Sequence, residues 1–257
     1  MFAEERQNLI LSLINSKGAV KISQLEKEFD VSKMTLWRDL KSLDDKGLIK
    51  KVYGGAVKID IIPPNEPTFE EKASSAIEEK RAIAKYAAKQ FIHKGEVISL
   101  GAGSTLLQMV PYLTQKNLTI LTSGLDTMMH VANYHPHINL MVCGGMVRQP
   151  AKALVGPEAE QFFRRNKADT AFLSASGITI KDGITDPHPL DIQVKKEMIK
   201  SAKRVIFLMD SHKVGKRLMA TTIPLDEIDM LLMDEGTPSS FIEALNSLRI
   251  LNKLVKI

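Results

Sequence analysis

From residue 97 onward, short apolar runs alternate with longer segments of helical periodicity, and this alternation restricts the possible folds. Apolar runs rich in Val, Ile and Leu are typical of buried strands. The strand candidates are Val97–Leu100, Leu118–Leu121, Ile138–Cys143, Thr170–Leu173, Val205–Met209 and Met230–Met233. The helix candidates are Leu106–Leu113, Leu125–Asn133, Pro157–Asn166, Leu190–Ala202 and Pro238–Leu248. This pattern predicts an α/β domain with a mainly parallel sheet and helices on both faces.

The segments that follow the strand candidates form the candidate ligand site, because ligands bind outside the carboxyl ends of parallel strands. In the first of them two glycines permit a tight turn, and Ser104 or Thr105 can cap a helix that begins at Leu106, where free N–H groups attract an anion. The expected ligand-binding residues are Gly101, Ala102, Gly103, Ser104, Thr105, Thr122, Ser123, Gly144, Gly145, Arg148, Ser176, Asp210 and Lys213. Such hydroxyl-bearing loops with one Arg and one Lys suit a phosphorylated, hydroxyl-rich small molecule, although each loop alone is also ordinary turn chemistry.

The first sixty residues follow a different pattern, with three short helices before a hairpin. Apolar residues repeat at helical spacing in the first two helices, and Ser32 is a good N-cap for a third helix from Lys33. The inward stripe of this third helix is Leu36, Leu40 and Leu43. Helix, helix, turn, helix is the arrangement of a helix-turn-helix domain, whose last helix fits the major groove of DNA.

The hairpin predicted over 47–57, with Gly54-Gly55 at or near its turn, would form a wing beside the third helix. Between Lys33 and Lys58 there are seven Lys and Arg against three Asp, which concentrates positive charge in this segment. The expected DNA-binding residues are Ser32, Lys33, Met34, Thr35, Trp37, Arg38, Lys41, Lys50, Lys51 and Tyr53. The lysines would contact phosphates, and Arg38 with Trp37 and Met34 would contact bases. The alternative interpretation is that these charged side chains form only a solvated face of a small helical domain and do not bind DNA.

A run with three prolines, residues 61–67, separates the two patterns. We therefore expect a winged helix-turn-helix domain over 1–58, a Pro-rich linker over 59–72 and an effector-sensing and oligomerisation domain over 73–257. A charged, alanine-rich helix is expected from Ile77 to Ile92.

Several function classes are disfavoured by the composition. The single cysteine, Cys143, lies in an apolar run and is expected to be a buried core thiol. The N-terminal residues lack the features of a signal peptide and no apolar run approaches the length of a membrane span, so we expect a cytoplasmic protein. His135, His137 and His188 have no acidic or thiol partner at ligand spacing, so we expect no metal ion and no cofactor, whereas His212 could line the ligand site.

The segments Val31–Leu40 and Tyr53–Ala56 resemble the winged helix-turn-helix of the DeoR family of bacterial transcription regulators. Trp37 departs from this family, which commonly has Arg there. Arg38 matches the pattern and is the expected groove contact. Asp39 also matches, and we expect it to orient Arg38 or a neighbouring helix.

The resemblance extends to the second domain through Gly101–Thr105, Gly144–Arg148, Val155–Ala159, Asp210 and Lys213. The regulatory domain of that family is similar to ribose-5-phosphate isomerase and glucosamine-6-phosphate deaminase, and many members sense a sugar phosphate. The resemblance therefore implies a repressor of a sugar catabolism operon that acts as a homodimer or homotetramer on double-stranded DNA. Departures from the family pattern at Thr122-Ser123-Gly124, Ser174 and Asp191 leave the identity of the effector open.

The alternative function is that of a sugar-phosphate isomerase or deaminase carrying a DNA-binding module. Such chemistry needs a base beside the reacting carbon and a cation for the developing oxyanion. Asp186, Asp191, Asp210 and Lys213 could be recruited, but no catalytic pair is specified by the sequence, so we assign no catalytic residue.

Overall fold

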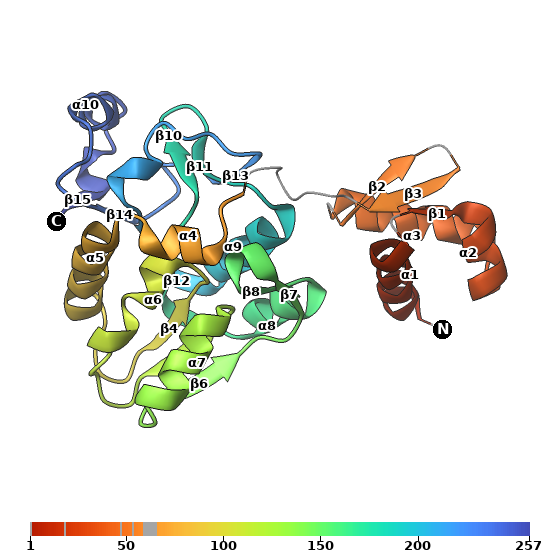
Figure 1. The fold of residues 1–257 in the computed structure, drawn as a ribbon, viewed down its shortest axis with the longest axis horizontal. Coiled ribbons are helices and arrows are strands. Elements are labelled where there is room, and N and C mark those ends of the chain that lie inside the picture. Colours follow the sequence, from red (N-terminus) through yellow and green to blue (C-terminus); the bar gives the residue numbers. More distant parts are fainter. Residues whose placement is uncertain (1, 18, 47, 53, 59–65) are drawn as a thin grey trace. The chain divides into compact units, whose positions relative to one another are not determined.

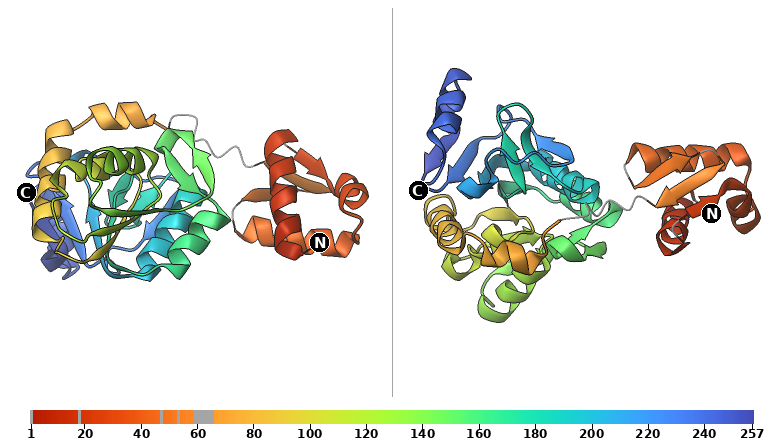
Figure 2. Two further views of the ribbon diagram at one scale, coloured as in Figure 1. Left: turned by 90° about the horizontal axis from the view of Figure 1, so that it is seen from below. Right: turned by 45° about the horizontal axis from the view of Figure 1, so that its top comes forward.

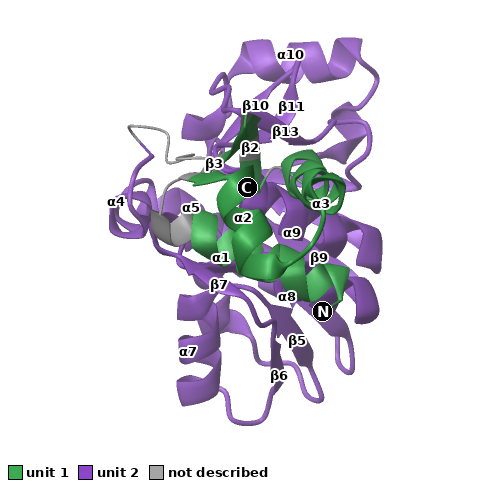
Figure 3. Ribbon diagram, turned by 90° about the vertical axis from the view of Figure 1, so that its right-hand side faces the viewer, with its two compact units in different colours: residues 1–63 green, residues 64–257 purple. Residues whose placement is uncertain are grey.

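The computed structural model describes residues 2–17, 19–46, 48–52, 54–58 and 66–257. The chain divides into two compact units, residues 1–63 and residues 64–257, which we call the N-terminal unit and the large unit (Figure 3). Residues 66–72, which we expected within the linker, belong to the large unit.

The N-terminal unit contains the expected helices and hairpin, together with one strand that we did not predict. Its elements are α1 (Ala3–Lys17), β1 (Ala19–Lys21), α2 (Ile22–Phe29), α3 (Lys33–Asp45), β2 (Ile49–Val52) and β3 (Gly55–Lys58) (Figure 1). The predicted inward stripe of α3 is buried. The unpredicted strand β1 pairs with β3 and makes a three-stranded antiparallel sheet of the wing.

A buried ion pair fixes α3 to α1. Arg6 donates from its Nε to Asp39 Oδ2 at 2.7 Å, and Gln7 donates to the other carboxylate oxygen at 3.0 Å. Asp39 therefore orients the neighbouring helix α1, which is one of the two roles that we expected for it.

The hairpin turn lies where it was expected, with Gly54 in the turn and Gly55 directly after it as the first residue of β3. Gly54 has a φ of +83°, a conformation that suits glycine. At Gly55 the constraint is space, since a Cβ there would lie 2.0 Å from the carbonyl oxygen of Val20 in β1. The absence of a side chain at Gly55 thus allows β1 to pair closely with β3 of the hairpin.

The large unit is built on a seven-stranded sheet in the order β15-β14-β12-β9-β4-β5-β6, in which every neighbouring pair is parallel. Its strands are β4 (Val97–Leu100), β5 (Thr119–Thr122), β6 (Asn139–Val142), β9 (Ala168–Leu173), β12 (Ala202–Leu208), β14 (Met230–Met233) and β15 (Leu254–Lys256). The predicted parallel α/β sheet is confirmed. The strand order reverses between β4 and β9.

Helices lie on both sides of this sheet, as the left view of Figure 2 shows. The helices are α5 (Ile77–Gln90), α6 (Ser104–Leu107), α7 (Leu125–Tyr134), α8 (Pro157–Arg165), α9 (Pro189–Ser201) and α10 (Ser239–Ser247). Buried residues of α5, α6 and α7 share one apolar cluster with Ile98, Phe172 and Ile206 of the sheet. On the other side, α8 and α9 pack against each other, and α9 also contacts β9 and β12.

Several elements of the large unit were not predicted. They are the short helix α4 (Phe69–Ser74), the edge strand β15 of the main sheet, the antiparallel hairpin of β7 (Met146–Arg148) and β8 (Ala153–Val155), and an antiparallel sheet of β10 (Gly177–Thr179), β11 (Gly183–Asp186) and β13 (Ala220–Ile223). The helix expected over 106–113 is instead α6 followed by a 3-10 turn over Val110–Tyr112, because Pro111 cannot donate a helical hydrogen bond. Further 3-10 turns cover Gln149–Ala151, Ser211–Lys213 and Leu251–Lys253.

Cys143 is buried, as predicted, and burial raises the pKa of its thiol to about 12. Such a thiol is protonated at neutral pH and is therefore a poor nucleophile. In the described part of the chain no helix combines the length and the apolar character needed to cross a membrane.

Replacement of Gly55 by alanine tests the close approach of β1 and β3. We expect Gly55→Ala to destabilise the N-terminal unit by about 3 kcal/mol or more, because the new methyl group overlaps a backbone oxygen. Gly54→Ala is the matched control and should cost only about 1–2 kcal/mol, the penalty of a left-handed conformation. Urea denaturation followed by the fluorescence of Trp37, the single tryptophan, measures both, and equal losses would contradict the explanation.

Candidate functional site

The outer face of α3 presents the side chains expected to contact DNA. Lys33, Met34, Arg38 and Lys41 are exposed, and Trp37 is half-buried at the edge of this face. The N–H of Thr35 donates to Ser32 Oγ at 3.3 Å, and the two hydroxyls lie 3.0 Å apart, so Ser32 caps α3 as predicted. The start of the helix is therefore fixed beside its cationic outer face.

The wing contacts this face through Lys51. Its ammonium lies 5.5 Å from the centre of the Trp37 ring, a cation–π contact, while its backbone N–H donates to Asp44 of α3 at 3.0 Å. Lys33 lies 3.7 Å from Glu26 of α2. Two other expected contacts cannot be placed, since the side chain of Lys50 and the whole of Tyr53 lie outside the described residues.

The large unit has a pocket of about 70 Å³ at the carboxyl ends of β4 and β9, where the strand order reverses. The expected ligand residues that line it are Gly101, Ala102, Gly103, Ser104, Thr105, Ser123, Arg148, Ser176 and Lys213. Polar lining residues outside that set are Glu66, Lys72, Ser174, Asp186, Asp191 and Lys195, of which Ser174 and Asp191 were expected near the site as departures from the family pattern.

Four expected ligand residues do not line the pocket. The hydroxyl of Thr122 is hydrogen-bonded to backbone atoms and is not free for a ligand. It donates to Leu100 O at 2.7 Å and accepts from Gly124 N at 3.0 Å. Gly144 and Gly145 are exposed, and a Cβ at Gly145 would lie 2.5 Å from the carbonyl oxygen of Val155 in the β7–β8 hairpin. Asp210 is buried beside the pocket, and its Oδ2 has no hydrogen-bond partner within the described residues.

The loop after β4 differs from its prediction in one respect. Helix α6 begins at Ser104 rather than Leu106, and its N-cap is Gly103, with a φ of +147° and no side-chain capping bond. Ser104 and Thr105 therefore lie inside the helix and do not cap it. Ser104 instead donates to the carbonyl oxygen of Lys72 at 3.3 Å, which joins this loop to α4.

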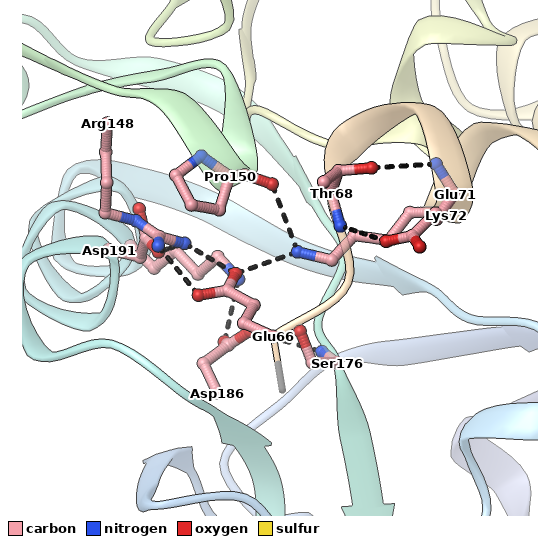
Figure 4. A network of polar contacts seen from close by, with 10 residues as sticks. Glu66, Thr68, Glu71, Lys72, Arg148, Pro150, Ser176, Asp186 and Asp191 are labelled. Carbon is pink, nitrogen blue, oxygen red and sulfur yellow. Dashed lines mark hydrogen bonds and ion pairs between the residues drawn. The ribbon is translucent and has the colours of Figure 1, made fainter. Parts of the chain in front are cut away.

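Glu66 is the centre of a network of ion pairs in the pocket (Figure 4). Arg148 donates from Nη1 to Glu66 Oε2 at 2.8 Å and from Nη2 to Glu66 Oε1 at 2.9 Å. Lys72 also donates to Oε1, at 2.8 Å, and Arg148 forms a second ion pair with Asp191. The side chains of Glu66, Arg148 and Asp191 are only 1%, 8% and 9% exposed.

This network controls the protonation of its members. Burial on its own would raise the pKa of Glu66, but hydrogen bonds from Arg148 and Lys72 outweigh it and lower the pKa to about 2. Burial likewise opposes the charge of Arg148, and Glu66 and Asp191 overcome it and raise the pKa of Arg148 above its usual value. Both groups are therefore ionised at every physiological pH.

Lys213 differs from the other cations of the pocket. Lys195 is paired with Asp186 at 2.7 Å, and Asp186 also accepts from Thr222 and from the N–H of Ser176. Among the described residues, the ammonium of Lys213 makes neither a hydrogen bond nor an ion pair. Burial lowers the pKa of Lys213, so an anionic ligand beside it would be stabilising.

The histidines serve structural roles or lie outside the pocket. His188 caps α9 by accepting from the N–H of Leu190, and the rings of His135 and His137 contact each other at 5.8 Å. His212 is exposed, lies 3.5 Å from Asp210 and does not line the pocket. No cluster of three potential metal ligands occurs among the residues that the structure describes.

Three of these additional residues lie in segments that we misassigned or missed, whereas Ser174 follows a predicted strand and Asp191 and Lys195 lie in a predicted helix. Glu66 and Lys72 fall in the expected linker, although Thr68 and Glu71 form a capping box that starts α4. The pattern Thr-x-x-Glu after a proline is a known signal for a helix start and could have identified α4. Asp186 ends β11, which was missed because the four residues Gly183–Asp186 contain one apolar side chain, that of Ile184.

Comparison with known proteins identifies both units. A family model described as the DeoR-like helix-turn-helix domain matches residues 6–61, and one described as the DeoR C terminal sensor domain matches residues 75–235. The chain belongs to the DeoR family. The resemblance inferred from the motifs is confirmed, and with it the prediction of a DNA-binding transcriptional regulator rather than an enzyme.

Relatives in the DeoR family match along nearly the whole chain. The HTH-type transcriptional regulator GolR of Listeria innocua is 33% identical over 237 residues, which are 91% of each protein. A putative aga operon transcriptional repressor of Escherichia coli O157:H7 is 29% identical and covers 94% of this chain and 90% of its own length. Among solved structures, ribose 5-phosphate isomerase A from Methanocaldococcus jannaschii is 20% identical over 56% of this chain and 57% of its own, with a TM-score of 0.42.

The stability of the large unit should depend on Glu66 in a pH-dependent way. Because the pKa of Glu66 falls from 4.5 to about 2 on folding, its carboxylate contributes about 3 kcal/mol above pH 4.5, and this contribution is lost as the pH falls towards 2. We therefore expect Glu66→Gln to lower the free energy of unfolding at pH 7 and the difference from wild type to shrink below pH 4.5. Circular dichroism during urea denaturation measures it, and a difference that does not change with pH would contradict the assignment.

Proposed function

We propose that the protein represses an operon for sugar catabolism, and that a phosphorylated sugar bound in the pocket of the large unit changes its affinity for operator DNA. The observation that carries the proposal is one pocket, in which the glycine loop at 101–105 and the unpaired cation Lys213 both line the cavity. Backbone N–H groups of such a loop and a lysine are suitable ligands for a phosphate. A coupling of about 1–3 kcal/mol between effector and DNA is typical of such regulators.

The N-terminal unit would bind DNA through α3 and the wing. Arg38 and Met34 are exposed on the outer face of α3, where a guanidinium can read guanine and an apolar chain can contact a thymine methyl group. Lys33, Lys41 and Lys51 would neutralise phosphates and make the affinity depend on salt. Trp37, in the place of the usual arginine, would support Lys51 through the ring contact.

We further propose that the protein acts in the cytoplasm as a homodimer or homotetramer. Operator DNA and sugar phosphates are both found inside the cell. Exposed apolar side chains on α7 and on the edge strand β6 support association of the large units. They are Met129, Tyr134 and Met141.

The decisive experiment is a binding assay with DNA from upstream of the gene and its neighbours, with and without a panel of sugar phosphates. We expect salt-dependent binding to one fragment, changed by one member of the panel. Absence of DNA binding at low salt, together with turnover of a sugar phosphate, would instead support the isomerase or deaminase alternative.

Replacement of Arg38 tests direct recognition of bases. We expect Arg38→Ala to cost about 1–3 kcal/mol on the preferred fragment and to relax its sequence preference. Lys41→Ala should weaken binding to all sequences. It should also reduce the slope of the logarithm of the binding constant against the logarithm of the salt concentration by about one. Arg81→Ala removes an exposed charge from the large unit and serves as the control. Fluorescence anisotropy at several salt concentrations separates these effects, and a loss in Arg38→Ala that is equal for all sequences would argue against base recognition.

Replacement of Lys213 tests effector binding. Lys213→Met removes the unpaired cation and should weaken the effector by about tenfold or more, while DNA binding without effector stays as in the wild type. Lys216→Met is the matched control, because Lys216 is exposed and does not line the pocket. Calorimetric titration with the active sugar phosphate gives the measurement, and equal affinities of the two variants would remove Lys213 from the site.

A further inference from the structure

A carboxylate of the protein itself already occupies an anion site in the pocket. Both oxygens of Glu66 accept from the guanidinium of Arg148, and Lys72 donates to one of them (Figure 4). A guanidinium offers the same pair of parallel donors to two oxygens of a phosphoryl group. Glu66 thus stands where an anionic ligand would bind between these two cations.

Arg148 has a donor that the present contacts do not use. Its two terminal nitrogens contact Glu66 and Asp191, but its buried Nε has no hydrogen-bond acceptor within the described residues. An unpaired buried donor on a charged group is destabilising. This donor points to a second state of the pocket, in which Arg148 has a further acceptor.

The charges around Arg148 determine how an anion can enter. Arg148 and Lys72 carry two positive charges, and Glu66 with Asp191 carries two negative charges, so the group is neutral as it stands. A neutral group does not attract a phosphoryl dianion, whereas the same group without Glu66 carries one net positive charge. At Arg148 an anion would therefore bind in place of Glu66, while the loop at 101–105 and Lys213 remain available in another part of the pocket.

We propose that Arg148 and Lys72 form an anion subsite for the effector, that Glu66 fills this subsite in the free protein, and that a phosphoryl or carboxylate group of the effector displaces it. The inference rests on the proposed function, because it requires that the pocket binds an anionic effector. An effector that reaches both this subsite and the loop at 101–105 carries two anionic groups.

Displacement of Glu66 also acts on the connection between the two units. Glu66 lies near the start of the large unit, so its ion pairs with Lys72 and Arg148 hold this entering segment in the pocket. Lys80 holds the other end of this region, because its buried ammonium donates to the carbonyl oxygens of Lys72 and Ser75. Release of Glu66 therefore frees the entering segment while α4 stays attached, and we expect Glu66→Gln to resemble the effector-bound state.

Calorimetric titration of the full-length protein with inorganic phosphate tests the subsite. An internal competitor lowers the apparent affinity by the fraction of time that it occupies the site, so Glu66→Gln should bind phosphate about tenfold or more tightly than the wild type. Glu66→Asp, whose shorter side chain reaches Arg148 less well, should show a smaller gain. The double variant Glu66→Gln, Lys72→Met should lose the gain. Glu70→Gln, which removes an exposed carboxylate of α4 paired with Lys152, should match the wild type.

The outcomes separate this inference from the proposed function. Phosphate binding that is equal or weaker in both Glu66 variants, with the wild type still binding, overturns the subsite and leaves the proposed function intact. Binding of phosphate by none of the proteins also overturns the subsite, and the proposed function is then decided by the DNA-binding assay with the sugar-phosphate panel. Circular dichroism establishes that each variant is folded, and Glu66→Asp, which retains the charge, provides the test where Glu66→Gln does not fold. DNA affinity of Glu66→Gln equal to that of effector-free wild type would overturn the link to the entering segment.

Discussion

The parallel pairing of β4 with β9 is the constraint on which the large unit depends. Later strands of the first half are added on one side, as β5 and β6, and those of the second half on the other side, as β12, β14 and β15. The loops that follow β4 and β9 therefore diverge at the carboxyl ends of their strands, and a crevice opens between them. The pocket is lined by Gly101–Thr105 after β4 and by Ser174–Ser176 after β9, so its position follows from the order of the strands.

The parts of the fold that could be predicted are those in which local pattern and tertiary role coincide. Runs such as Val97–Leu100 and Met230–Met233 are apolar because both faces of a parallel strand are buried, and they are recovered with their bounds unchanged. The antiparallel sheet of β10, β11 and β13 was missed because its strands contain few apolar residues and depend on distant partners. Ile184, for example, pairs with Ile223, and neither residue lies in a run that suggests a strand.

The residues of the ligand pocket could also be predicted only in part. The glycine loop, Arg148 and Lys213 follow recognisable motifs, and the structure gathers them around one pocket. Glu66 and Lys72 were missed because three prolines suggested a linker, although the capping box of Thr68 and Glu71 marks the start of α4. Thr122 was expected in the site because it follows a strand, but its hydroxyl is used to bridge the ends of β4 and β5.

The carboxylates of the pocket are suited to exchange of partners and poorly suited to proton transfer. A general base needs a pKa near the working pH and a lone pair directed at the substrate. Glu66, with a pKa of about 2, is too weak a base, and Asp186 already accepts from Lys195, Thr222 and Ser176. An ion pair of this kind can be replaced by another anion with only the difference between the two interactions as its cost. That small difference is what a regulator requires, because it lets the ligand concentration decide which anion Arg148 holds.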